Sequence, residues 1–123
     1  MERKLYYPVM SSPAPRVVIT ARGEQRVRSR HPWIYRADVA EVHASGGDIV
    51  EVLGPRSRRL GDALFSDRSQ IPIRMLTLGE QRADDALFRA RLERALQFRE
   101  SLQLDASAYR VVHGEGDLLP SLI

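Results

Sequence analysis

The stretch SGGDIVEVLGPRSRRLGDALFS, residues 45–66, carries the pattern that decides the fold. Its apolar segment 49–53 lies between Gly46-Gly47 and Gly54-Pro55, two pairs of residues that mark turns. The basic turn after Pro55 leads into a second extended segment, residues 59–66. Two such segments joined by a tight turn predict neighbouring strands in a small β-rich domain.

Further short strands are predicted on both sides of this hairpin. The β-branched RVVIT at 16–20 predicts a strand, and WIYR at 33–36 and VAEV at 39–42 predict two extended pieces. In IPIRMLTL, residues 71–78, apolar side chains alternate as in a half-buried strand, and Pro72 indicates a sheet edge or a strand start. Gly23 is expected to break the chain after the first strand, with about two helical turns over 24–30. Residues 16–79 are therefore predicted to form a compact, mostly antiparallel β-barrel or sandwich.

The pattern changes to a helical one after Gly79. Acidic residues at 84 and 85 suit a helix N-terminus, and 86–103 is rich in helix formers. Arg99 falls within the apolar face of this helix, so it needs a carboxylate partner, for which Glu115 and Asp117 are the candidates. The other members of that face are Phe88, Leu92, Ala95 and Leu102.

The final segment YRVVHGEGDLLPSLI, residues 109–123, is predicted to form a strand, a glycine-rich turn and a second apolar strand. We expect the chain to be truncated within that last strand. The unpaired strand 119–123 is then expected to drive self-association.

Composition excludes several classes of site. The 123 residues contain no cysteine, so disulfides, thiolate metal sites and a cysteine nucleophile are excluded. No apolar run has the length of a membrane span, and the N-terminus lacks a secretory signal core, so a cytoplasmic protein is expected. The histidines at 31, 43 and 113 lack the spacing of metal ligands. We expect no metal site and no catalytic residue in this chain.

Positive charge is concentrated in the first part of the chain. Residues 1–79 hold thirteen basic and eight acidic side chains, whereas residues 80–123 hold six and eight. Eighteen of the nineteen cations are arginine, whose planar guanidinium suits bidentate contacts with phosphates. The asymmetry indicates that the first part of the chain faces a polyanion.

The basic stretch RVRSRHPWIY, residues 26–35, contains the candidate site. Proline ends the preceding helix, so cations are presented at its end, beside the single tryptophan, Trp33. For these arginines, the alternative to RNA contact is a solvated basic face. Trp33 is expected to pack in the barrel as an anchor, and His31 either caps a turn or contacts RNA. The predicted RNA-binding residues are Arg22, Gly23, Arg26, Arg28, Arg30 and His31. For the arginines of the turn 56–59, the favoured interpretation is a solvated hairpin tip, and a secondary contact with phosphate is the alternative.

Five segments of the chain occur in the same order as in one protein family. They are ITARGEQRVRSRHPWIYRADVAEV, GDIVEVL, RLGDALFSDRSQIPIRMLT, FRARLERALQFRESL and YRVVHGEGDLLPSLI. The chain is similar to the N-terminal part of bacterial ribosomal RNA large-subunit methyltransferases that modify cytosine at carbon 5. The resemblance covers roughly residues 16–123. It implies a PUA domain, a small pseudo-barrel that binds RNA, followed by a linking α+β region and then an S-adenosylmethionine-dependent domain.

This resemblance implies an α+β chain with a PUA-like RNA-binding domain at 16–79 and the truncated start of the linking region at 80–123. Residues 1–15, which end in SSPAP and have no counterpart in the family, are expected to form an N-terminal arm or linker. Asp62, Asp67 and Pro72 depart from the usual pattern, which weakens any role for the surface of the strand 59–66. The chain lacks both the cofactor loop and the cysteine nucleophile of such enzymes. It is therefore expected to be inactive alone and to hold no cofactor, S-adenosylmethionine being expected for the missing catalytic domain.

Two functions follow from these observations. The first is an RNA-binding module of a ribosomal RNA methyltransferase, with ribosomal RNA as its partner and no membrane role. The second is a protein-interaction β-domain with no RNA role, whose apolar strand pairs with a partner.

Overall fold

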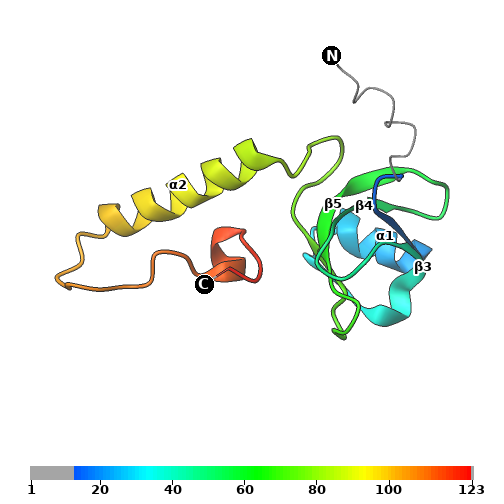
Figure 1. Ribbon diagram of the computed structural model, residues 1–123, viewed down its shortest axis with the longest axis horizontal. Coiled ribbons are helices and arrows are strands. Elements are labelled where there is room, and N and C mark those ends of the chain that lie inside the picture. The colour runs from blue at the N-terminus through cyan, green and yellow to red at the C-terminus, as the bar shows by residue number, and fades with distance from the viewer. Residues whose placement is uncertain (1–12, 123) are drawn as a thin grey trace, which may run out of the picture.

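The computed structural model describes residues 13–122, and most of the arm expected at 1–15 lies outside this range. One six-stranded sheet with the order β2-β6-β5-β4-β1-β3 curls into an open barrel (Figure 1). This confirms the predicted pseudo-barrel with added helices. The elements are β1 Arg16–Ile19, α1 Ala21–Arg28, β2 Trp33–Ile34, the 3-10 helix η3 Arg36–Asp38, β3 Val39–His43, β4 Ile49–Leu53, β5 Arg59–Phe65, β6 Ile73–Met75, α2 Asp85–Ser101 and the 3-10 helix η4 Gly114–Asp117.

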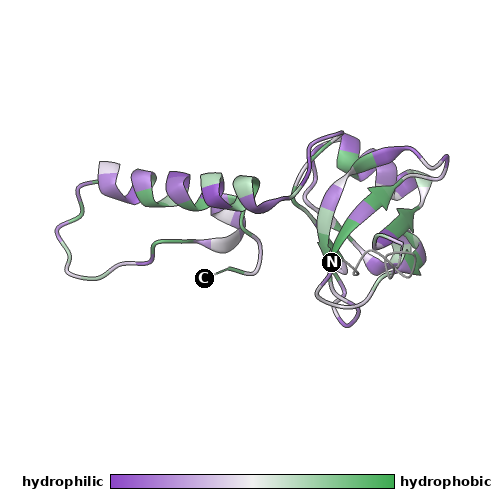
Figure 2. Cartoon of the chain, turned by 45° about the horizontal axis from the view of Figure 1, so that its top comes forward, coloured by the Kyte–Doolittle hydropathy of each residue, from purple (hydrophilic) through white to green (hydrophobic). Residues whose placement is uncertain are grey.

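The strands pair as the turn signals predict. β4 and β5 form the hairpin of residues 49–65, and β6 pairs with β5 and begins directly after Pro72. Among the strand pairs of residues 13–122, only β1–β4 is parallel. Alternate residues of β1 and β4 are fully buried in the barrel. Figure 2 shows hydrophobic residues, in green, along the barrel strands. The barrel core consists of Val17, Ile19, Val27, Ile34, Val50, Val52, Leu60, Ala63, Phe65 and Ile73.

The helix α1 begins earlier than predicted, and the role expected for Gly23 as a chain break is wrong. Gly23 is buried in the first turn of α1, and its N–H donates to Oγ1 of the N-cap residue Thr20 at 3.1 Å. A Cβ at position 23 would lie 3.2 Å from both the Ile19 and Asp38 Cβ atoms. Glycine is therefore used here because the helix lies close to β1 and η3.

Glycine is required again where the chain leaves the barrel. Gly61 in β5 has φ +150°, and a Cβ there would overlap the carbonyl oxygen of Thr77. The close approach lets the N–H groups of Leu76 and Thr77 both donate to the Asp62 carbonyl, at 2.8 and 3.1 Å. The chain after β6 is thus fastened to β5 before it turns toward α2.

Asp62 strengthens the same junction. Its buried carboxylate accepts hydrogen bonds from Arg59 Nη1 at 2.8 Å and from the Ala83 N–H at 2.8 Å. Burial raises the pKa of Asp62, but the hydrogen bonds from Arg59 and Ala83 and the nearby cationic charges outweigh burial, and its pKa lies below the ordinary value. This departure from the family pattern therefore joins the barrel to the segment before α2.

The helix α2 and the following segment form a second lobe, residues 84–122, which extends away from the barrel (Figure 1). The predicted helix is confirmed, with Asp84 as its N-cap accepting from the Leu87 N–H at 2.9 Å. Ala95, Val112 and Leu119 make a small core against Phe88. We call this part of the chain the helical lobe.

The predicted partner for Arg99 is confirmed. Its guanidinium binds the Asp117 carboxylate through two hydrogen bonds of 3.1 and 2.6 Å, and the two side chains are only 11% and 13% exposed. Glu115, the other candidate, instead accepts a hydrogen bond from Trp33 Nε1 at 3.1 Å.

The prediction of two strands within residues 109–123 is wrong. Residues 118–122 form no strand, and Leu118 and Ser121 have φ values of 61° and 71°, which an extended strand cannot contain. Within the sheet that residues 13–122 form, no strand pairs with them. The packing role expected for Trp33 is also wrong, because its side chain is half-buried at the junction of the two lobes, whereas its neighbour Ile34 is fully buried.

We expect Gly61→Ala to lower the free energy of unfolding by more than about 3 kcal/mol, because it adds a steric overlap to an unfavourable φ. Gly79→Ala is the matched control, since Gly79 has φ +65° but no atom within 4 Å of an added Cβ. Its cost should be about 1–2 kcal/mol. Equal losses in urea unfolding would contradict the close approach at Gly61.

Candidate nucleic-acid interface

The basic face of α1 is organised by one buried carboxylate. Asp38, at the end of η3, is 1% exposed and accepts hydrogen bonds from Arg22 Nε at 2.7 Å and Arg26 Nε at 3.2 Å. Thr20, the N-cap of α1, donates its backbone N–H to the Asp38 carbonyl at 2.8 Å. η3 therefore fixes both the start of α1 and two of its arginines.

The ionised form of Asp38 is favoured. Burial raises the pKa of Asp38, but the hydrogen bond from Arg22 and the charges of Arg22 and Arg26 outweigh burial, so the pKa lies below the ordinary value. The arginine side chains themselves reach solvent, being 66% and 38% exposed. The pairing thus orients these two cations without burying them.

The geometry leaves donors for a ligand. Each arginine uses its Nε–H on Asp38, and among residues 13–122 no hydrogen bond involves the terminal Nη groups of either. The Arg26 guanidinium also lies 5.3 Å above the centroid of the Tyr35 ring. Two oriented guanidinium ends on one helix face can bind phosphate oxygens.

Arg28 is placed differently from its neighbours. It pairs with Glu24 one turn earlier, with Nε at 2.8 Å from Oε2. An exposed pair of this kind contributes little to stability and can exchange partners. Arg28 also lines a cavity of about 330 Å³ with Arg56 and Arg58 of the β4–β5 turn. The basic hairpin tip therefore lies beside α1, while Arg59 is 9% exposed in its ion pairs with Asp62 and Glu51.

Arg30 and His31 lie at the turn after α1. Arg30 has φ 65°, its side chain is exposed, and no ion pair involves it in the described part of the chain. His31 Nδ1 lies 3.2 Å from the Trp33 N–H, and its ring is in edge contact with the Trp33 ring. His31 therefore caps the turn, one of its two expected roles.

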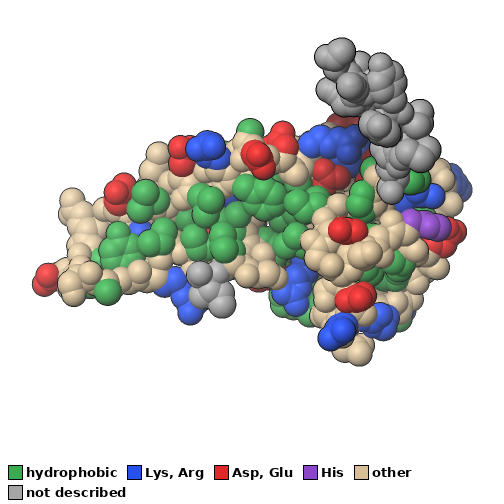
Figure 3. All heavy atoms as spheres, in the orientation of Figure 1, with side chains coloured by type: hydrophobic (Ala, Val, Ile, Leu, Met, Phe, Trp, Pro, Cys, Tyr) green, Lys and Arg blue, Asp and Glu red, His purple; other side chains and the backbone are tan. Residues whose placement is uncertain are grey.

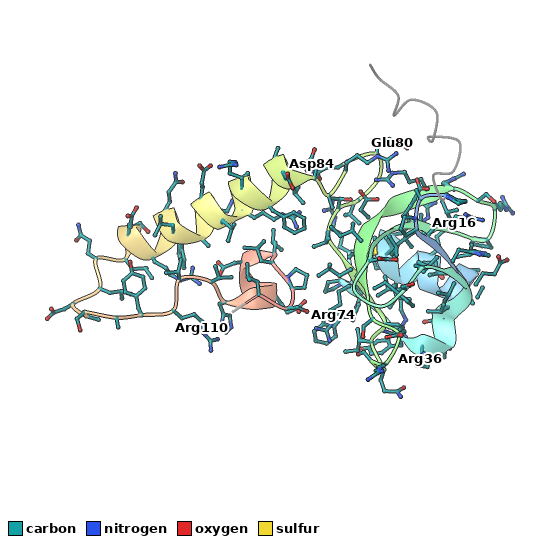
Figure 4. All side chains as sticks on the ribbon, in the orientation of Figure 1. Arg16, Arg36, Arg74, Glu80, Asp84 and Arg110 are labelled. Atoms are coloured by element: carbon teal, nitrogen blue, oxygen red, sulfur yellow. The ribbon has the colours of Figure 1, made fainter. Side chains whose placement is uncertain are left out.

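The structure thus brings Arg22 and Arg26 together on the side of α1 that faces Asp38, whereas Arg28 lies on the side that faces Glu24 and the β4–β5 turn. Arg30 and His31 follow α1, and Gly23 is buried within it. Other arginines lie apart from this group. Arg16 and Arg36 are on other parts of the barrel, and Arg74 and Arg110 line a small cavity between the lobes (Figure 4). Across residues 13–122 no group of His, Asp or Glu side chains is arranged to hold a metal ion. No helix in the same residues is long and apolar enough to cross a membrane.

Sequence reasoning missed Arg91 of α2. It lies with Arg30 and His31 around a cleft between the two lobes. No sequence pattern around Arg91 predicts this arrangement, because the cleft forms where residues about sixty positions apart pack together.

Residues 17–78 match the family described as PUA-like domain. The chain belongs to this family of PUA-like domains. The match covers the barrel from β1 to the end of the segment after β6.

Relatives extend over both lobes. The chain is 34% identical over 125 residues to a ribosomal RNA large subunit methyltransferase of Deinococcus radiodurans, covering 94% of this chain and 31% of that protein. It is 33% identical over 112 residues to ribosomal RNA large subunit methyltransferase I of Escherichia coli, covering 87% of this chain and 28% of that protein. The PUA-like chain therefore spans less than a third of the length of these relatives.

A solved structure shares the fold. A Streptococcus mutans protein assigned as a SAM-dependent methyltransferase superposes with a TM-score of 0.69 at 13% identity, over 85% of this chain and 28% of that chain. The region of this chain that superposes extends beyond the PUA-like barrel.

We expect Asp38→Asn to lower the free energy of unfolding by about 1–3 kcal/mol at pH 7, because two charge-assisted hydrogen bonds are lost. The pKa of Asp38 is lower in the folded than in the unfolded protein, so its contribution is complete above about pH 5. That contribution is lost as the pH falls below about 4 toward the folded-state pKa. The stability difference between wild type and Asp38→Asn should therefore shrink in acid.

The exposed Asp105→Asn is the control and should change stability by less than about 0.5 kcal/mol. Chemical unfolding at pH 3, 4, 5 and 7 measures all three proteins. A wild-type advantage that stays constant down to pH 3 would rule out the ionised role of Asp38.

Proposed function

We propose that this chain is an RNA-binding part of a ribosomal RNA large-subunit methyltransferase. The observation that carries the proposal is the pair of arginines on α1 that Asp38 orients through Nε, leaving their Nη groups available. The PUA-like family and the names of the relatives support this assignment.

The binding step follows from the charges. An RNA backbone brings phosphates to the basic face, and each guanidinium end offers parallel N–H donors to two phosphate oxygens. Arg28 can leave Glu24 for a phosphate at small cost because its pair is solvent-exposed. Such contacts fix the position of RNA without reading its sequence.

The chemistry belongs to a further part of the protein in this proposal. The target is carbon 5 of a cytosine in large-subunit ribosomal RNA, and S-adenosylmethionine supplies the methyl group when bound by the catalytic domain. This chain, with no cysteine, contributes the positioning of RNA rather than the reaction. The resemblance to the family supports the cytosine target, the use of S-adenosylmethionine and action in the cytoplasm.

A protein-interaction role has an observation of its own. Apolar side chains gather along α2 and the segment after it (Figure 3), several of them more than 40% exposed. Exposed apolar surface of this kind favours association. The face comprises Leu92, Leu96, Phe98, Leu102, Leu104, Tyr109, Val111, Leu118 and Leu122. We propose that it supports self-association in place of the strand pairing expected from the sequence.

For RNA binding, we expect the triple variant Arg26→Ala, Arg28→Ala and Arg30→Ala to bind fragments of large-subunit ribosomal RNA more weakly, whatever their sequence. Each lost phosphate contact should lower the magnitude of the log–log salt slope by roughly 0.7–0.9. Arg22 keeps its bond to Asp38 in this variant, so the fold should survive. Fluorescence anisotropy at several salt concentrations measures the slope.

The matched control replaces three exposed arginines outside α1, at positions 68, 89 and 94, with alanine, so net charge changes equally. It should retain most of the wild-type slope. If the control and the α1 variant lose the same affinity and slope, general charge rather than this face binds RNA. A folded α1 variant with unchanged binding would refute the proposal.

For self-association, we expect a concentration-dependent dimer that Leu96→Glu abolishes, because the substitution puts a charge on the exposed apolar face. Arg89→Glu, at an exposed polar position of the same helix, is the control and should leave the dimer intact. Sedimentation velocity at several protein concentrations measures the distribution. A wild-type monomer at every concentration would contradict this role.

A further inference from the structure

A cleft of about 490 Å³ lies between the barrel and the helical lobe. Its volume is within the range of pockets that hold small ligands or single groups of larger ones. Its walls come from the turn after α1, the segment after β6, α2 and the chain near η4, so neither lobe forms it alone. None of the residues that line it is acidic.

Arg91 of α2 is the unusual member of the lining. Its guanidinium donates to the carbonyl oxygens of Leu76 at 2.6 Å and Leu118 at 2.9 Å, and within residues 13–122 it has no carboxylate partner. Burial, together with the charge of Arg94, lowers the pKa of Arg91 below its ordinary value. Two of its five N–H donors are used in these bonds, so three remain for a ligand.

Of the other cavities that arginines line, two contain no acid, one that includes Arg74 and one that includes Arg28, Arg30, Arg58 and Arg59, and two contain an acid. Glu24 lies in the cavity beside the β4–β5 turn, and Glu115 lies in the one that Arg74 and Arg110 line. The cleft instead adds Arg30 to Arg91, and Arg30 has no ion pair in the described range. Two cations without a local counter-charge indicate an anionic ligand.

Most of the other lining residues are apolar or aromatic, and Thr77 and Gln81 are the polar ones among them. His31 and Pro32 lie at one wall, Met75 follows along β6, and Leu118 lies at the opposite wall. Flat or apolar side chains of this kind can pack against a nucleobase. The cleft therefore combines donors for a phosphate with a surface for a base.

We propose that this cleft binds one unpaired nucleotide of the RNA, with Arg91 and Arg30 binding its phosphate and His31, Met75 and Leu118 packing against its base. The proposal rests on the RNA-binding function and adds to it a second contact, supplied by α2. It makes the chain prefer RNA with an unpaired nucleotide over a continuous helix.

The first test uses Leu118→Glu, which places a carboxylate at the cleft. The Leu118 side chain is 51% exposed, and Arg91 binds only its carbonyl oxygen, so the fold and this bond should persist. Leu122→Glu is the matched control, being 41% exposed and outside the lining. The probes are two RNA hairpins of equal length, one with a single-nucleotide bulge and one fully paired.

We expect the wild-type chain to bind the bulged hairpin about tenfold more tightly than the paired one. Leu118→Glu should bind the two hairpins equally, whereas Leu122→Glu should keep the preference. Arg91→Gln should also lose the preference, with Arg89→Gln on the exposed part of α2 as its control.

The failures can be told apart. If no hairpin binds, the RNA-binding function itself fails. If both hairpins bind through the α1 arginines with equal affinity, or if Leu118→Glu keeps the preference, RNA binding stands and the cleft proposal is overturned.

Discussion

The ion pairs of Asp38 with Arg22 and Arg26 are the interaction on which the rest of the barrel surface depends. A carboxylate that is 1% exposed needs partners, and the structure provides them from the helix that covers it. The helix in turn approaches closely enough only because position 23 has no side chain. One contact therefore sets the docking of α1, its N-cap and the direction of its cations.

The contacts between the barrel and the helical lobe are of a different kind from the Asp38 ion pairs. They combine a backbone acceptor with a carboxylate: Arg91 of α2 donates to the Leu76 carbonyl of the barrel, and Glu115 of the helical lobe accepts from Trp33 and pairs with Arg74. The segment before α2 is held through its backbone, because Arg59 donates to the Gln81 carbonyl and the Asp62 carboxylate accepts from the Ala83 N–H. A backbone carbonyl remains when its side chain is replaced, so the bonds to Leu76 and Gln81 depend on the identity of Arg91 and Arg59 rather than on that of their acceptors.

The barrel and the long helix could be predicted from the sequence because their signals are local. The turn pairs around 49–53 and the alternation in 71–78 lie within the elements that they specify. A carboxylate partner for Arg99 could be predicted because an arginine on an apolar face demands one. The sequence left Glu115 and Asp117 open, and the structure shows Asp117.

The errors arise where distant residues decide the outcome. Gly23 has the local signature of a chain break, but its proximity to Ile19 and Asp38 makes it part of a helix. Residues 118–122 have a strand-like composition, yet a strand also needs a neighbour with free backbone groups. Asp38 carried no sequence signal because its burial depends on η3 and α1 together, and Arg91 gained its place from the packing of two lobes.

The hydrogen bond between Trp33 Nε1 and Glu115 gives the molecule an internal optical reporter. The indole belongs to the barrel and the carboxylate to the helical lobe, and the chain has one tryptophan. When the indole is excited at a wavelength that the four tyrosines do not absorb, the emission therefore comes from the junction alone. Changes in the separation of the lobes can be followed in the unlabelled protein, in real time and without a dye.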